Sequence, residues 1–221
     1  MLAVQNEFKA RMAEVDRYFQ FLHDFDQNLV TVSAGIHGQP PMTASEKSEL
    51  FKTLKANGFL LLYNLTEATL RNAIEAIFDE FKTQGVSFDD CRREVRHIVL
   101  KNLKQHNVGE LLPKLSTISV DLVVTTFRKD KLFFGNVDGR RIRKIADEYG
   151  FLRPSKRSAE LLTVKTNRND LAHGNKSFAE VGRDFDVNRL QAIKGEVEAF
   201  IDEAIVNIAD YIATRAYLSN P

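Results

Sequence analysis

The chain has 221 residues, of which 43% are hydrophobic and 28% charged, with a formal net charge of +1, so it can bury one sizeable core. Its longest apolar run, residues 59–63, is far shorter than the about 20 residues that cross a bilayer, and its charged N-terminal stretch is unlike a signal peptide. We therefore expect one cytoplasmic domain over residues 1–221 without a membrane span, and the single cysteine, Cys91, excludes an internal disulfide and a cysteine zinc site.

The first half of the chain predicts two long helices. Apolar residues recur every three or four positions over residues 3–30, which is helical spacing. Residues 31–45 contain Gly, Pro and small polar residues, as loops do. Within this stretch, Thr43 and Glu46 have the spacing of a capping box, which begins a new helix. That helix carries an apolar stripe as far as Phe81, so we expect it at the centre of the core, with a bend at Gly58.

The second half predicts further helices and one ambiguous segment. Residues 89–106 begin with acids and end with bases, which predicts a basic amphipathic helix. Residues 117–127 are rich in β-branched side chains but have no partner strand, so helix and strand both stay open. Glycine or cap residues delimit three more helices: Asp138 to Tyr149 before Gly150, Ser158 to Ala172 before Gly174, and Asp186 to Tyr217. The pattern predicts an all-α helical bundle with additional short helices.

Charge is distributed unevenly along the chain. Residues 128–168 contain twelve Lys or Arg and five Asp or Glu, whereas residues 180–210 contain three basic and eight acidic residues. A nearly neutral chain can therefore still present a basic face to a phosphate backbone. The candidate RNA-contacting residues are Arg140, Arg141, Arg143 and Lys144. The alternative is that both runs are ordinary solvated helix faces.

A search for catalytic patterns leaves one candidate. The sequence has no HExxH, no paired CxxC, no histidine cluster and no Gly-rich phosphate loop, so we expect no metal and no cofactor. Arg168 and His173 stand in KTNRNDLAHGN with four residues between them. Two other pairs have similar spacing and are interpreted as ordinary residues of amphipathic helices: Arg17 with His23, and Arg92 with His97. His173 differs because it ends its helix directly before Gly174, where its side chain can reach outward.

The pair suits phosphate chemistry. Histidine changes charge near neutral pH and serves as a general acid or base, while Arg168 offers a planar fork of donors to a phosphate. Five residues of an ideal helix advance by about 7.5 Å and turn by about 140°, so one Arg168 and one His173 need not converge on one atom. A two-fold dimer would bring two copies of the motif together.

Three segments, residues 61–77, 132–151 and 168–184, resemble the HEPN superfamily, and more closely its MAE-type HEPN-like nuclease branch. The resemblance implies a helical-bundle homodimer that cleaves RNA without metal, often in defence or toxin systems with an antitoxin partner. His173 would act as general base or acid and Arg168 would stabilise phosphate charge, leaving a 2′,3′-cyclic phosphate and a 5′-hydroxyl. Some HEPN toxins have a tyrosine where this chain has Asn175, so silencing by modification of that residue is not expected.

Four further residues are supporting candidates with alternatives left open. Asn169 and Asp170 either orient the histidine or contact the sugar, or they are exposed helix residues. Asn64 and Glu67 either line the cleft beside His173, or Glu67 forms an i,i+4 ion pair with Arg71. Two rival functions also remain: a non-catalytic helical dimer that binds RNA or a protein through the basic face, and a metal-dependent DNA nuclease using acidic residues of the last helix.

Overall fold

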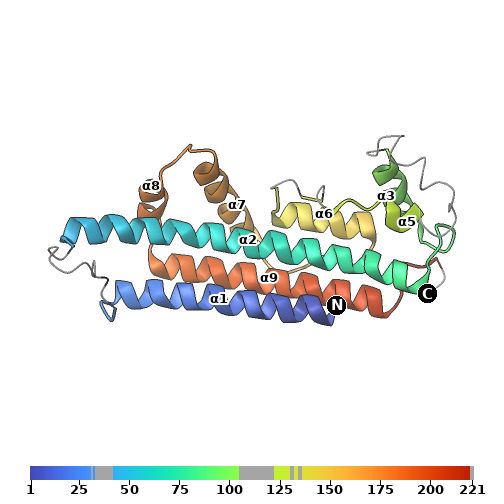
Figure 1. Ribbon diagram of the computed structural model, residues 1–221, viewed down its shortest axis with the longest axis horizontal. Coiled ribbons are helices and arrows are strands. Elements are labelled where there is room, and N and C mark those ends of the chain that lie inside the picture. The colour runs from blue at the N-terminus through green and yellow to red at the C-terminus, as the bar shows by residue number, and fades with distance from the viewer. Residues whose placement is uncertain (31, 33–41, 105–121, 130–131, 134–135, 220–221) are drawn as a thin grey trace. The chain divides into compact units, whose positions relative to one another are not determined.

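The computed structural model describes residues 1–30, 32, 42–104, 122–129, 132–133 and 136–219 (Figure 1). Over these ranges the chain is helical and has no strand, apart from an isolated antiparallel bridge between Cys91 and Leu218. The prediction of an all-α fold is confirmed. No helix in the described ranges has the length and the apolar character needed to cross a membrane.

The helices form two compact units, which we name by their central short helices. The α6 unit comprises residues 1–7, 67–157 and 199–221, and the α7 unit comprises residues 8–66 and 158–198. Three long helices contribute residues to both units: α1 (Leu2–Asp26), α2 (Ala44–Gln84) and α9 (Val187–Ala213). The α6 unit also contains α3 (Arg93–Leu103), α5 (Leu122–Thr125) and α6 (Gly139–Tyr149). The α7 unit also contains α7 (Ala159–Ala172) and α8 (Phe178–Arg183). The prediction of a single domain over residues 1–221 stays a prediction.

The start of α2 is the capping box expected from the sequence. The N–H of Glu46 donates to the Thr43 hydroxyl at 3.2 Å, and the N–H of Thr43 donates to the Glu46 carboxylate at 2.7 Å. The helix then continues uninterrupted through Gly58. A Cβ at Gly58 would lie 3.3 Å from the Phe19 ring, so the glycine lets α1 and α2 approach closely within the α7 unit.

Most of the other predicted helix ends are also confirmed. The Asp138 side chain accepts the N–H of Arg141 at 2.8 Å, and Gly150 ends α6 with φ of 84°. Asp186 caps α9, but that helix ends at Ala213, four residues before the predicted end. The first helix likewise ends at Asp26 rather than at residue 30. Within the ambiguous segment, residues 122–125 are helical, and residues 117–121 lie outside the described residues.

Each unit has its own apolar core. In the α7 unit, side chains from α1, α2, α7 and α9 are at most 2% exposed, including Phe19, Leu22, Phe59, Leu62, Leu161, Leu190 and Ile193. Burying one such side chain contributes about 1.5–3 kcal/mol. The core of the α6 unit is rich in aromatic rings: Phe78 stacks on Phe127 with 4.0 Å between ring centroids, and the Tyr211 hydroxyl donates to the Tyr149 carbonyl. The first contact holds the segment after α5 against α2, and the second joins α9 to α6.

Candidate active site

The end of α7 places His173 on the surface. The N–H of Gly174 donates to the Leu171 carbonyl at 3.3 Å, and the N–H of Asn175 donates to the Asp170 carbonyl at 2.8 Å. Together with the φ of 69° at Gly174, these bonds form a Schellman motif, which ends a helix in a fixed geometry. The C-cap residue is His173, and its side chain is exposed. The expectation that this histidine ends its helix and reaches outward is confirmed.

Arg168 lies one and a half turns earlier, with its guanidinium fixed against an aromatic ring. The guanidinium carbon is 4.5 Å from the centroid of Tyr63 on α2, a cation–π contact. Tyr63 is 1% exposed, so the ring is a rigid support. One guanidinium nitrogen also donates to the Asn169 side-chain oxygen at 2.9 Å. A guanidinium has five N–H donors, so this arrangement leaves donors for a phosphate.

Sequence reasoning did not select Tyr63 as a site residue. Tyr63 and Arg168 are more than a hundred residues apart, and no local pattern reports a contact over that separation. Only the packing of α7 on α2 brings them together.

The two supporting candidates next to Arg168 have different surroundings. The side chain of Asn169 accepts from Arg168, and its carbonyl accepts the N–H of His173 at 2.9 Å. The Asp170 carboxylate lies 3.3 Å from the Lys176 ammonium across the turn. Asn169 is therefore placed to orient Arg168, whereas Asp170 is tied to the turn that follows.

The supporting candidates on α2 fall in different units. Asn64 is exposed and follows Tyr63 in the α7 unit. Glu67 belongs to the α6 unit, where it forms an ion pair with Arg71 at 2.5 Å. The i,i+4 pair is confirmed. The alternative role of Asn64 and Glu67 beside His173 stays a prediction.

A short helix that the sequence analysis did not locate follows the site. Ser177 and Glu180 form a capping box at the start of α8, with the N–H of Ser177 donating to the Glu180 carboxylate at 2.8 Å. These hydrogen bonds lower the pKa of Glu180. The Ser-x-x-Glu spacing was the sequence signal that could have revealed this helix.

Helix α8 packs directly on the backbone of α2. A Cβ built on Gly182 would lie 1.8 Å from the carbonyl oxygen of Lys52, so only glycine allows this approach. Beyond α8, the Lys55 ammonium donates to the Phe185 carbonyl at 2.6 Å, and burial lowers the pKa of Lys55. The rings of Phe59 and Phe185 also meet edge to face, with 4.8 Å between centroids. The segment after His173 is thus anchored to α2 at several points.

The basic residues predicted to contact RNA lie in the α6 unit and differ in availability. Arg143 donates to the carbonyls of Pro154 and Lys156, and its guanidinium lies over the Phe200 ring. Arg143 therefore holds the segment that follows α6.

Exposure and intramolecular contacts also differ among the other three RNA-contact candidates. Arg141 donates to the Leu132 carbonyl and lies 3.9 Å from Glu148. Arg140 and Lys144 are exposed and one helical turn apart. These two are the stronger candidates for phosphate contacts.

Arg92, from another Arg–His pair, has different surroundings from Arg168. Arg92 donates to the carbonyls of Gly150 and Ala216 and pairs with Glu94. Such a set of intramolecular contacts is what a structural arginine makes, which supports the interpretation of this pair as ordinary.

Acidic residues of the last helix also make structural contacts. Glu203 accepts from the Ser155 hydroxyl and the Lys156 N–H, and Glu196 accepts the N–H of Glu160 near the start of α7. Across the described part of the chain, no three His, Cys, Asp or Glu side chains are grouped so as to hold a metal ion.

Comparison with known proteins gives a match to a family model. The model of the MAE-like HEPN domain family matches residues 3–217, nearly the whole chain. No curated protein and no solved structure matches the chain.

Proposed function

Because the chain belongs to the HEPN family, whose members often act as ribonucleases, we propose that it is a metal-independent endoribonuclease with Arg168 and His173 as its catalytic residues. The observation that carries the proposal is the geometry at the end of α7. An exposed histidine caps the helix, and the guanidinium of the paired arginine is held over Tyr63. A proton carrier and a phosphate-binding fork thus occupy one short, well-anchored segment.

The reaction would be attack of a ribose 2′-hydroxyl on the adjacent phosphorus. The bond from O2′ to phosphorus forms and the bond from phosphorus to O5′ breaks, giving a 2′,3′-cyclic phosphate and a 5′-hydroxyl. One proton leaves O2′ and one reaches O5′, and His173 performs one of these transfers. Arg168 stabilises the charge that develops on the non-bridging oxygens, with Asn169 orienting its guanidinium.

A second copy of the chain would supply the other proton transfer. Leu162, Asn169 and His173 follow one another at helical steps of seven and four residues, so they share a face of α7. Leu162 is 52% exposed on this face. An exposed leucine on the face of α7 that also carries His173 fits a face that a partner copy covers, which supports a homodimer.

Because HEPN proteins often act in defence or toxin systems, we also propose that this protein acts in such a system in the cytoplasm, with an antitoxin or similar partner. An RNA substrate fits the exposed basic side chains Arg140 and Lys144 on α6.

The test is single-turnover cleavage of a labelled RNA by wild type and variants. His173→Ala removes the proton carrier from an exposed helix end, so folding and RNA binding should persist while the rate falls by at least about 100-fold. The matched control is His23→Ala, the histidine of another Arg–His pair in the α7 unit, which should cleave at the wild-type rate. Circular dichroism checks folding, and excess EDTA should leave the wild-type rate unchanged.

Other results would redirect the assignment. Wild-type cleavage by folded His173→Ala would reject the motif. Loss of cleavage in EDTA, restored by magnesium, would favour a metal-dependent nuclease. RNA binding by wild type without any cleavage would favour the non-catalytic RNA-binding dimer.

A further inference from the structure

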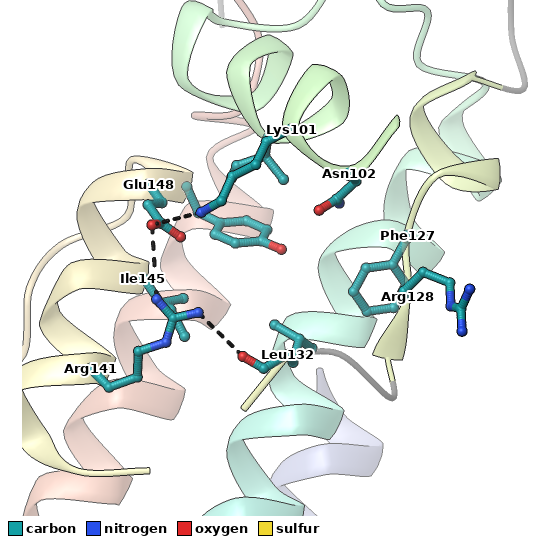
Figure 2. Close-up of a pocket in the computed structure, with 10 residues that line it drawn as sticks. Lys101, Asn102, Phe127, Arg128, Leu132, Arg141, Ile145 and Glu148 are labelled. Atoms are coloured by element: carbon teal, nitrogen blue, oxygen red, sulfur yellow. Dashed lines mark hydrogen bonds and ion pairs between the residues drawn. The ribbon is translucent and has the colours of Figure 1, made fainter. Parts of the chain in front are cut away.

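The α6 unit contains a small pocket whose lining is rich in charge (Figure 2). It lies between α3, α6 and the segment after α5, and its volume is about 70 Å³. Three basic side chains, one carboxylate and one amide contribute to its lining: Lys101, Arg128, Arg141, Glu148 and Asn102. The lining therefore carries net positive charge, which attracts an anion.

Two of these basic side chains converge on the single carboxylate. The Lys101 ammonium lies 3.0 Å from a Glu148 oxygen, and the Arg141 guanidinium lies 3.9 Å from the same oxygen. Arg141 also donates to the Leu132 carbonyl at 3.3 Å, which aims its guanidinium toward the pocket, as Figure 2 shows. The Lys101 ammonium and the Arg141 guanidinium thus point at one position, which a Glu148 oxygen occupies.

We propose that this pocket is a binding site for a phosphate group, held by Lys101 and Arg141. The pocket, at about 70 Å³, is much smaller than the neighbouring groove of about 440 Å³, so it suits one compact anion better than a whole nucleotide. Phosphate oxygens accept charge-assisted hydrogen bonds from ammonium and guanidinium groups, and arginine can bind them with two parallel bonds.

The sugar and base attached to such a phosphate have space outside the pocket. A second, more open groove of about 440 Å³ shares Ile98, Lys101 and Glu148 with the pocket. Its lining also contains Arg93 and His97 and two carboxylates, Glu94 and Asp147, which pair with Arg92 and Arg153. Four exposed side chains recur along one face of α3 at helical spacing: Arg93, His97, Lys101 and Lys104. This basic face leads to the pocket, so the phosphate can come from a free nucleotide or from an RNA strand.

Glu148 would compete with the bound phosphate. Its carboxylate pairs with both basic side chains when the pocket is empty, and a phosphate must displace it. Glu148→Gln should therefore tighten phosphate binding. If the charged side chains of the pocket only hold α3 against α6, Glu148→Gln should show no phosphate binding.

The experiment is calorimetric titration of the full chain with inorganic phosphate and with adenosine 5′-monophosphate. Saturable binding is expected, weakened at least about tenfold by Lys101→Gln because a charge-assisted hydrogen bond is lost. Glu148→Gln should bind both probes more tightly than wild type. Lys82→Gln is the matched control, since Lys82 is an exposed lysine of the same unit that does not line the pocket, and it should bind as wild type does.

RNA oligonucleotides with and without a 5′-phosphate identify the source of the phosphate. Their affinities are measured in the His173→Ala background, in which cleavage is expected to be at least about 100-fold slower. If Lys101→Gln weakens only the phosphorylated oligonucleotide, the pocket binds a strand end; if it weakens both, it binds a backbone phosphate. If it weakens only mononucleotide binding, the ligand is a free nucleotide.

Two results would overturn the proposal. One is the absence of saturable binding of all the probes to both wild type and Glu148→Gln. The other is unchanged affinity in folded Lys101→Gln, a substitution at a half-exposed side chain that should not affect folding. The proposal goes beyond the ribonuclease assignment, because it concerns binding alone: a protein that fails to cleave RNA can still bind phosphate here, and the reverse also holds.

Discussion

At the residue scale, the contact between Arg168 and Tyr63 explains how a long, flexible side chain can hold one orientation at the surface. An arginine loses side-chain entropy when it is fixed, and stacking on a rigid ring offsets part of that loss before any substrate arrives. A guanidinium already oriented toward a phosphate stabilises the transition state without reorganisation. The ring should therefore affect the catalytic rate although it never touches the substrate.

Replacing Tyr63 tests this role. Tyr63→Leu removes the aromatic face, so we expect cleavage to fall about tenfold, within the range of about 0.5–2 kcal/mol for a cation–π contact. Tyr63→Phe keeps the face and should retain most of the rate. Single-turnover kinetics on both folded variants makes the comparison. Equal rates in the two variants would show that the ring does not position Arg168.

At the element scale, α8 and its glycine fix where the segment that follows His173 lies. Gly182 meets the Lys52 backbone so closely that the two helices can pack only without a side chain between them. The capping box of Ser177 and Glu180 fixes the other end of the same short helix. The position of α8 therefore depends on a close backbone contact and a cap as well as on the buried side chain of Val181.

Substitution of this glycine should be costly. Gly182→Ala forces α8 away from α2, and we expect a loss of about 1–3 kcal/mol in the free energy of unfolding, as for other overpacked sites. Gly195→Ala is the matched control in the same unit, because a Cβ there meets nothing within 4 Å. Gly195 lies inside a helix, so this change should stabilise by about 0.5–1 kcal/mol. Urea denaturation of both variants measures the difference, and equal stabilities would contradict the close approach.

The helix ends also show what sequence reasoning can and cannot recover. Thr43 with Glu46, Asp138 and Gly150 are short-range signals, because a cap involves residues only a few positions apart. The same rules placed His173 at the end of its helix. The roles of Arg143 and Tyr63 were not recoverable, because each depends on a ring brought close by tertiary packing. A count of basic residues cannot separate an exposed Arg140 from an Arg143 that holds a loop.

At the scale of the whole molecule, the proposed chemistry needs two proton transfers, while one chain offers a single histidine at the motif. The face of α7 that carries His173 also carries the exposed Leu162. A dimer across this face would bury the leucine and place two histidines in one site. Assembly and activity should therefore be lost together.

A charge on this face should separate the subunits. Leu162→Glu places a carboxylate where the partner would pack, and burying an unpaired charge is strongly unfavourable. We expect light scattering to report a dimer for wild type and a monomer near 25.1 kDa for the variant, with cleavage reduced at least about 100-fold. Leu152→Glu is the control, since Leu152 is 73% exposed and lies in the α6 unit. A wild-type monomer with full activity would refute the composite site.

The turn between α7 and α8 has a consequence for sequence variation among relatives. Three residues, Gly174 to Lys176, separate the histidine from the cap of the next helix. Backbone hydrogen bonds fix the end of α7, and the capping box of Ser177 and Glu180 fixes the start of α8. An insertion or deletion here would displace either His173 or α8, so the length of the turn should be invariant. The side chain of Asn175 is exposed, and it is the backbone N–H of this residue that takes part in the helix end. Evolution can therefore exchange this residue, even for the tyrosine of some HEPN toxins, without moving the histidine.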